Sequence, residues 1–202
     1  MPPPLYSLDL EGRRNFCLEG GNFIYIRIPK NASSSIAVAV GDPQPVPVDT
    51  YHSRIILNPE NKFIFTFSRN PFSRLVSCWV NRTSSGKKSH GEGDWNNPEL
   101  VGLSFNEFAQ GVCETPDKDA DHHFRSQYRF VEDLNVDYIG KVETIEKDLQ
   151  DLFKIIHKNS EIPHLKQSTH KPYKEYYDKK LMKMVHKRFE KDFELFDYDS
   201  KL

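Results

Sequence analysis

The sequence predicts an α/β protein with a central, mostly parallel sheet flanked by helices. Two apolar runs, residues 23–28 and 62–68, have the β-branched and aromatic composition of buried strands. Each run leads through a short turn into a segment with helical spacing of apolar residues, at 33–40 and 71–79. Two successive strand–turn–helix units are typical of an α/β fold.

The remaining elements complete a single domain over residues 1–202, a length that suffices for one hydrophobic core. The expected elements are a strand at 136–142, helices at 143–158 and about 178–191, and a short helix at 105–109 with a capping box of Ser104 and Glu107. Residues 1–22 are rich in proline and then glycine, and we expect an irregular lead-in there. Residues 81–99 are polar, and we expect a long exposed loop.

Composition limits the possible functions. The net charge of −1 argues against a general nucleic-acid or membrane binder, because such proteins rely on excess positive charge. The three cysteines include no C-x-x-C pair, so neither a disulfide framework nor a zinc site is indicated. No apolar segment near the N-terminus predicts a signal peptide or membrane anchor, so we expect a cytoplasmic protein with reduced thiols. A Golgi-type protein from which such an N-terminal segment had been removed would show the same sequence features.

The first turn, Pro29 to Ser35, has the properties of an anion-binding site. A strand that turns directly into a helix leaves main-chain N–H groups pointing at one place, and the helix dipole adds partial positive charge there. Lys30 adds a full positive charge, and Ser33, Ser34 and Ser35 add hydroxyl donors. The turn is not a nucleoside-triphosphate loop, because it has no glycine and its lysine precedes the serines. On its own, the segment is explained equally well as a serine-capped helix after a core strand.

The second turn also carries a cation. Arg69 follows the strand directly, and Pro71 suits the first position of the helix. Ser77 lies two turns into that helix, on a face that can look back toward the strand end. A guanidinium matches phosphate oxygens with its forked donors, whereas for Arg74 we expect an internal ion pair with a carboxylate. Two anion sites at successive turns predict one ligand with two anionic groups.

The second turn carries a family resemblance. The segment Phe67-Ser68-Arg69-Asn70-Pro71-Phe72-Ser73-Arg74-Leu75-Val76-Ser77 resembles the 3′-phosphate-binding motif of the sulfotransferases, especially the carbohydrate branch with the chondroitin, dermatan and heparan O-sulfotransferases. The Pro-Lys turn resembles the 5′-phosphosulfate loop of the same family. The resemblance implies a three-layer, P-loop-like fold. It also implies 3′-phosphoadenosine 5′-phosphosulfate (PAPS) as the donor and adenosine 3′,5′-bisphosphate (PAP) as the product.

The resemblance implies the following donor-binding residues: Lys30, Asn31, Ala32, Ser33, Ser34, Ser35, Arg69, Ser77 and Lys171, with His170 as a further candidate. Lys171 lies in a segment that closes over the nucleotide in relatives. The implied reaction is in-line transfer of the sulfuryl group to a hydroxyl, on a carbohydrate, while Lys30 stabilises the departing bridging oxygen. A histidine is the expected general base. The candidates are, in order, His52, His123 and His122, with Glu60 or Glu132 as the alternative.

Residues 121–127 resemble the His-aromatic-x-Pro-Gln stretch of carbohydrate sulfotransferases, with Ser126 in place of the proline. This segment either lines the acceptor cleft or packs on the surface. Its adjacent histidines invite interpretation as a metal site, but no third ligand at metal spacing is evident, so we expect no metal.

Two other functions stay open. A P-loop-type kinase would need a glycine-rich loop and a magnesium-binding acid at a strand end, and neither is evident. A non-catalytic nucleotide-binding or glycan-binding protein on the same scaffold fits the same motifs. The acceptor is also open between a glycan, a small sugar, a lipid-linked saccharide and a small alcohol, and so is the oligomeric state.

Overall fold

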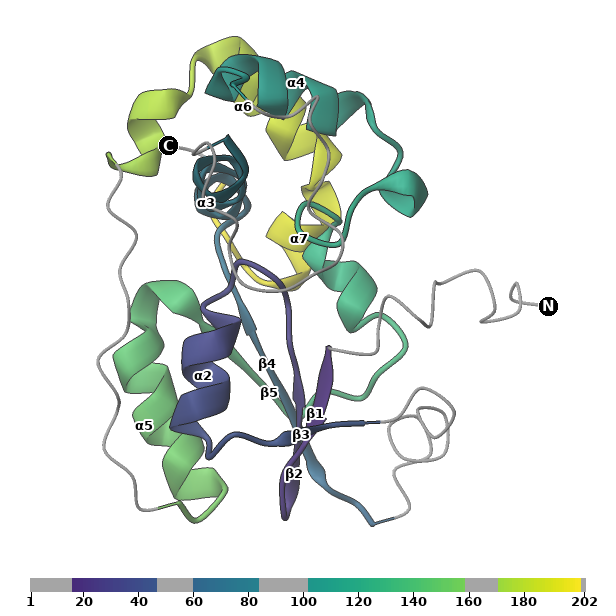
Figure 1. Ribbon diagram of the computed structural model, residues 1–202, viewed down its shortest axis with the longest axis vertical. Coiled ribbons are helices and arrows are strands. Elements are labelled where there is room, and N and C mark those ends of the chain that lie inside the picture. The colour runs from purple at the N-terminus through teal and green to yellow at the C-terminus, as the bar shows by residue number, and fades with distance from the viewer. Residues whose placement is uncertain (1–15, 47–59, 84–101, 159–170, 201–202) are drawn as a thin grey trace, which may run out of the picture. The chain divides into compact units, whose positions relative to one another are not determined.

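The computed structural model describes residues 16–46, 60–83, 102–158 and 171–200 (Figure 1). The chain divides into two compact units, each built from two stretches of sequence. The sheet unit comprises Met1–Arg69 and Gln127–Lys166, and the helical unit comprises Asn70–Ser126 and Gln167–Leu202. Each unit has its own hydrophobic core. A single domain over the whole chain stays a prediction.

Among the described residues, the sheet unit contains one sheet with the strand order β3-β1-β2-β4-β5. Its strands are β1 (Cys17–Glu19), β2 (Phe23–Ile26), β3 (Gln44–Pro45), β4 (Phe63–Ser68) and β5 (Tyr138–Lys141). The three longest strands, β2, β4 and β5, run parallel, and β1 pairs antiparallel with β2 and β3. The predicted α/β class with a mostly parallel sheet is therefore confirmed. Because Ile26 pairs with Thr66 in parallel, β2 and β4 end at the same edge of the sheet.

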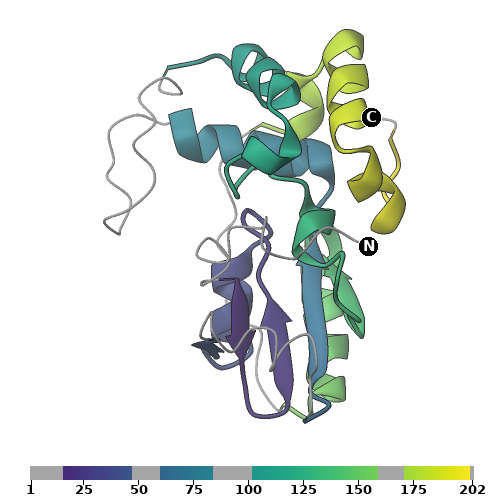
Figure 2. The same cartoon turned by 90° about the vertical axis from the view of Figure 1, so that its right-hand side faces the viewer.

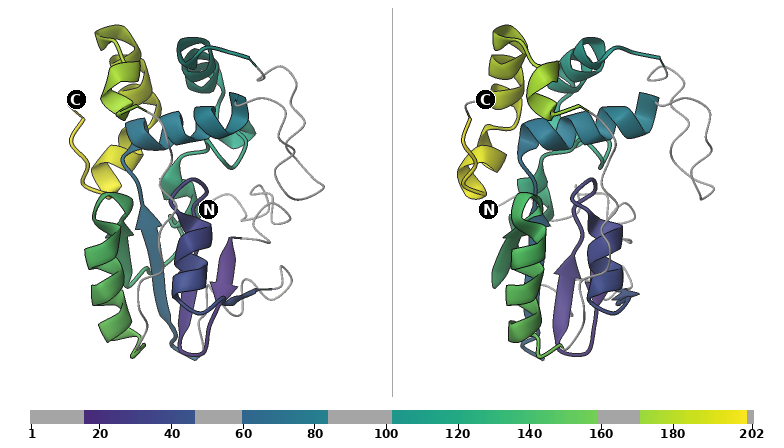
Figure 3. Two further views of the ribbon diagram at one scale, coloured as in Figure 1. Left: turned by 60° about the vertical axis from the view of Figure 1, so that its left-hand side comes forward. Right: turned by 90° about the vertical axis from the view of Figure 1, so that its left-hand side faces the viewer.

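Aromatic side chains form the core on one face of this sheet. Alternate residues of a strand point to the same face, and there Tyr25 of β2 and Phe65 of β4 stack with ring centroids 4.8 Å apart. Helices α2 (Ser33–Ala39) and α5 (Ile145–Ile155) lie over this face and share its core (Figure 3). The opposite face of the sheet is buried as well. Its side chains from β2 and β4 are each at most 3% exposed: Ile24, Ile26, Ile64 and Thr66.

Two boundaries differ from the sequence prediction. Residues Cys17–Glu19 form β1, within the stretch 1–22 that the sequence predicts to be irregular. This strand is too short to show a periodic pattern and is ordered by its pairing with β2. Helix α3 continues through Thr83, into the predicted loop at 81–99, because no glycine or proline stops it there. The rest of that loop lies outside the described residues.

The helical unit is built from α3 (Pro71–Thr83), α4 (Phe105–Glu114), α6 (Lys179–Arg188) and α7 (Glu190–Leu195), with short 3₁₀ turns (Figure 2). Helix α4 begins with the predicted capping box, which is therefore confirmed: the hydroxyl of Ser104 accepts from the main-chain N–H of Glu107, whose carboxylate accepts from that of Ser104. The predicted C-terminal helix is two helices, because the chain turns at Phe189. Within the described ranges, no helix combines the length and apolar character needed to cross a membrane.

Candidate functional site

The first predicted turn has a strained backbone. The non-glycine residues Lys30 and Ala32 have φ angles of 71° and 55°, in the left-handed region. Such residues cost about 1–3 kcal/mol each and persist where the surrounding structure holds them. Helix α2 begins at Ser33 with Ala32 as its N-cap, and no side chain caps it. The serine cap expected from the sequence is therefore wrong, and the three serines are instead the first three residues of the helix.

The start of α2 leaves several donors without an acceptor inside the helix. The first i→i−4 hydrogen bond runs from the N–H of Ile36 to the oxygen of Ala32, at 3.0 Å, so the N–H groups of the three serines precede it. Ser34 is exposed, and Ser33 and Ser35 are half-buried. These groups alone do not define a site, and the neighbouring turn supplies further positive charge.

Arg69 joins the second turn to the first. It follows β4 directly, is half-buried, and donates from Nη1 to the main-chain oxygen of Lys30 at 3.0 Å. Both turns follow parallel neighbouring strands, so they lie at the carboxyl edge of the sheet, where open α/β sheets bind ligands. The structure thus brings together the two turns that the sequence analysis assigns to one anionic ligand.

A buried pair of amides also ties the two turns together. Gln127 is fully buried; its Oε1 accepts from the N–H of Arg69 at 3.0 Å, and its Nε2 donates to the carbonyl oxygen of Arg69 at 2.8 Å. The same Oε1 accepts from Nδ2 of Asn31 at 2.7 Å, and that Nδ2 also donates to the carbonyl oxygen of Phe67 at 2.7 Å. Sequence reasoning gives Gln127 no such role, although the residue ends the segment 121–127 that resembles a family motif.

Asn31 is predicted to contact the donor, but its side chain lies inside the protein. The side chain is 0% exposed, and the main-chain N–H donates to the oxygen of Ile28 at 3.3 Å. Its Oδ1 has no hydrogen-bond partner among the described residues, and an acceptor oxygen offers nothing to an anion. These contacts make Asn31 part of the scaffold of the turn.

Ser77 and Arg74 lie on α3, in the helical unit, and both are buried. The predicted pairing of Ser77 with Arg69 would join the two units and stays a prediction. Arg74 is internal, as expected, and its guanidinium donates to the main-chain oxygens of Arg125 at 2.7 Å and His122 at 3.5 Å. It therefore holds the turn that carries the two adjacent histidines, while its predicted ion pair with a carboxylate stays a prediction.

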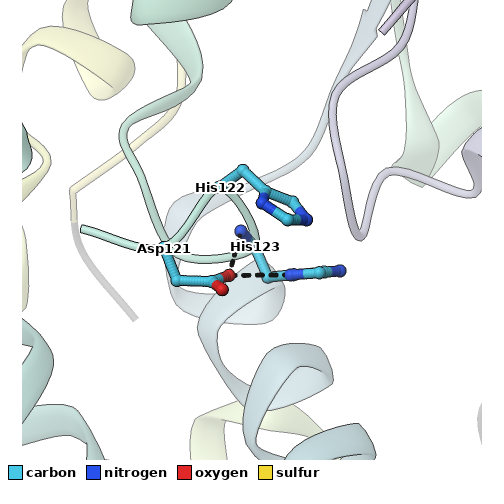
Figure 4. A group of neighbouring side chains, drawn as sticks. All are labelled: Asp121, His122 and His123. Atoms are coloured by element: carbon cyan, nitrogen blue, oxygen red, sulfur yellow. Dashed lines mark hydrogen bonds and ion pairs between the residues drawn. The ribbon is translucent and has the colours of Figure 1, made fainter. Parts of the chain in front are cut away.

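Figure 4 shows this turn, in which Asp121 contacts His123. Oδ1 of Asp121 accepts from the main-chain N–H of His123 at 2.8 Å and lies 2.7 Å from its Nδ1. Burial would raise the pKa of Asp121, but these hydrogen bonds outweigh burial and hold it below its usual range. When Nδ1 of His123 donates in this contact, Nε2 is the basic nitrogen.

The same turn has the composition of a metal-ligand group. Asp121, His122 and His123 each offer one ligand atom, and these atoms lie within 4.8 Å of one another. The sequence argument against a metal, the lack of a third ligand, is therefore wrong, because Asp121 supplies one. The carboxylate already accepts from His123, so the observed contacts are explained as a turn that orients this histidine. That the protein binds no metal stays a prediction.

The other predicted residues have less structural context. Lys171 is exposed. Glu60 and Glu132, the alternative bases, are exposed and form ion pairs with Lys62 and Arg129 respectively, both at 3.0 Å. Such surface pairs do not distinguish either glutamate as a base. The predicted candidates His52 and His170 lie outside the described residues.

Comparison with known proteins gives one finding. A family model described as the sulfotransferase family matches residues 47–199, which is most of the chain. The match includes Arg69, Ser77 and Gln127, and it begins after the Pro-Lys turn. Among curated proteins and solved structures there is no significant match.

Proposed function

Because this chain belongs to the sulfotransferase family, we propose that it transfers the sulfuryl group of PAPS to a hydroxyl group of a carbohydrate. The hydrogen bond from Arg69 to the main-chain oxygen of Lys30 carries the proposal, because two basic turns then meet at one edge of the sheet. PAPS has anionic groups at its 3′ and 5′ positions. Two adjacent basic turns match this distribution of charge.

Each turn binds a different part of the donor. Lys30 binds the 5′-phosphosulfate, together with the hydroxyl and main-chain N–H groups of the serines that follow it. Arg69 binds the 3′-phosphate, because its planar guanidinium matches phosphate oxygens with two parallel hydrogen bonds. Ser77 completes the 3′-phosphate site, and Lys171 adds positive charge over the nucleotide.

The reaction is an in-line displacement at sulfur. The acceptor oxygen forms a bond to sulfur, the bond from sulfur to the bridging oxygen breaks, and PAP leaves with that electron pair. The ammonium of Lys30 stabilises the charge that develops on the bridging oxygen. The proton of the hydroxyl moves to a general base, for which we propose His52.

Calorimetry tests the donor. We expect PAP to bind with a dissociation constant of about 1 μM in the absence of Mg²⁺, and ATP not to bind. Lys30→Ala and Arg69→Ala should each weaken PAP binding by about tenfold or more, because each removes a charge-assisted contact. The matched surface controls Lys183→Ala and Arg129→Ala should bind PAP as the wild type does. Binding of ATP that requires Mg²⁺, without binding of PAP, would show a kinase instead.

Transfer of labelled sulfate to a panel of glycans, small sugars and alcohols tests the reaction. If all label stays in PAPS although PAP binds tightly, the protein binds the nucleotide without transferring sulfate. His52→Ala should lower kcat while PAP affinity stays near that of the wild type. Unchanged turnover in this variant would remove His52 as the base.

A further inference from the structure

The amide of Gln127 is held in one orientation by the main chain of Arg69. The N–H of Arg69 can only donate and its carbonyl oxygen can only accept, so Oε1 must face the former, at 3.0 Å, and Nε2 the latter, at 2.8 Å. Because Gln127 is 0% exposed, water does not compete for these bonds. The side chain therefore fixes the main chain of Arg69 just after β4 ends.

The orientation of Gln127 in turn fixes that of Asn31. One terminal atom of the Asn31 side chain lies 2.7 Å from two acceptors, Oε1 of Gln127 and the carbonyl oxygen of Phe67. Because both neighbours are acceptors, that atom must be the nitrogen. Rotating the amide of Asn31 would bring its oxygen against two other oxygens. The nitrogen and oxygen atoms of both side-chain amides can therefore be assigned in only one way.

This chain of bonds supports a strained segment. Asn31 stands between Lys30 and Ala32, the two left-handed non-glycine residues of the first turn. Such a backbone persists only where surrounding contacts hold it. The side chain of Asn31 supplies two such contacts, one to the carbonyl oxygen of Phe67 in β4 and one to Gln127, which itself holds the main chain of Arg69. The guanidinium of Arg69 supplies a third, to the oxygen of Lys30.

We infer that Gln127 and Asn31 are positioning residues for the donor. Gln127 holds Arg69 where its guanidinium reaches both the oxygen of Lys30 and the 3′-phosphate. Asn31 holds the turn of Lys30 for the 5′-phosphosulfate. Neither amide touches the donor itself, and the inference rests on the proposed function.

The test compares PAP with adenosine 5′-monophosphate, which lacks the 3′-phosphate. Gln127→Met removes the amide and keeps the length of the side chain without adding charge. We expect it to weaken PAP binding by about tenfold or more and to weaken binding of the monophosphate less, because Gln127 acts mainly through Arg69. Asn31→Ala should weaken both ligands by a similar factor, because it acts on the turn that both use. Gln150→Met, on the exposed side of α5, is the matched control and should change neither.

A double-variant cycle separates positioning from general damage. In an Arg69→Ala background, Gln127→Met should cost PAP affinity much less than it does in the wild type, because its effect passes through the missing guanidinium. Thermal unfolding and calorimetric stoichiometry establish the folded fraction of each variant. Equal losses for both ligands in Gln127→Met, or additive losses in the cycle, would overturn the role of Gln127. Unchanged binding in Asn31→Ala would overturn that of Asn31. Failure of the wild type to bind PAP would refute the proposed function instead.

Discussion

The buried ion pair of the helical unit makes the sharpest prediction for stability. Arg188 donates from Nη2 to Oδ1 of Asp117 at 2.8 Å and from Nη1 to Oγ of Ser126 at 2.9 Å. The main-chain N–H of Ser126 also donates to Asp117, at 2.9 Å. With side chains only 9% and 16% exposed, Arg188 and Asp117 have little water around them. This pair closes the segment 117–126, which includes the turn of His122 and His123.

Removal of one partner should be costly. In Arg188→Met the apolar stem is kept and the N–H of Ser126 still donates to Asp117, but this carboxylate loses its counter-charge. Breaking a buried pair in this way costs about 3–5 kcal/mol, and partial exposure favours the lower end, about 3 kcal/mol. The double variant Asp117→Asn/Arg188→Met should be less destabilised than the sum of its single variants, because no unpaired charge stays buried.

The effect should also depend on pH. Burial raises the pKa of Asp117, but the hydrogen bond from Ser126 and the charge of Arg188 outweigh burial and lower the pKa below its usual value. A lowered folded-state pKa stabilises the protein above the unfolded-state pKa of about 3.9, and this stability is lost as pH falls through the folded-state value. Arg188→Met should raise the pKa of Asp117. Its difference from the wild type should therefore be largest near neutral pH and shrink in acid.

Urea unfolding at several pH values measures both effects. The wild type, both single variants and the double variant are compared through their midpoints and slopes. A loss below about 1 kcal/mol at pH 7, which is typical of surface pairs, would contradict the buried character of Arg188. A difference in unfolding free energy between Arg188→Met and the wild type that grows as the pH falls would contradict it as well.

Three further predictions concern stability and reactivity. Gly140→Ala should lower the free energy of unfolding by about 1–3 kcal/mol, because the added Cβ would lie 2.4 Å from the buried ring of Phe67. The control is Gly111→Ala in α4, where the added Cβ would have no atom within 4 Å. Urea denaturation should show this control to be stabilised by about 1 kcal/mol. Burial raises the pKa of Cys113 to about 11, so iodoacetamide at pH 8 should alkylate this thiol slowly until urea is added. Asp121→Asn should destabilise the protein at pH 7, and urea unfolding should show the difference from the wild type shrinking only as the pH falls from the unfolded-state pKa of about 3.9 toward the lower folded-state pKa, because hydrogen bonds outweigh burial and lower the pKa of this carboxyl.

Local pattern was enough to predict the three parallel strands of the sheet unit and the turns that follow the first two. The apolar runs at 23–28 and 62–68 are β2 and β4, and helical spacing correctly predicts α5. Short elements are different. β1 has three residues and pairs with β2, so its order comes from a partner rather than from its own sequence. The N-cap of α2 was missed for a similar reason: serine is the usual cap, but Ala32 adopts a left-handed backbone that no local preference indicates.

Contacts between distant residues were the part that sequence could not supply. Gln127 is 58 residues from Arg69 and 96 from Asn31, and nothing in its neighbourhood identifies either partner. A third metal ligand is usually expected some residues away from a histidine pair, whereas the turn brings the adjacent Asp121 back onto His123. In both cases the pattern contained the residue, and only the fold showed what it contacts.

These long-range contacts also distinguish the first turn from a plain strand-to-helix connection. The family model matches residues 47–199 and leaves out the turn of Lys30, whose own sequence fits a plain strand-to-helix connection equally well. That turn nevertheless receives a hydrogen bond from Arg69, and Asn31 within it donates to Gln127, both inside the matched region. A plain connection would need neither bond, nor two left-handed residues around a fully buried asparagine. We therefore propose that Lys30 binds the donor because of the residues that hold its turn, and losing those bonds should weaken donor binding while the lysine itself is still present.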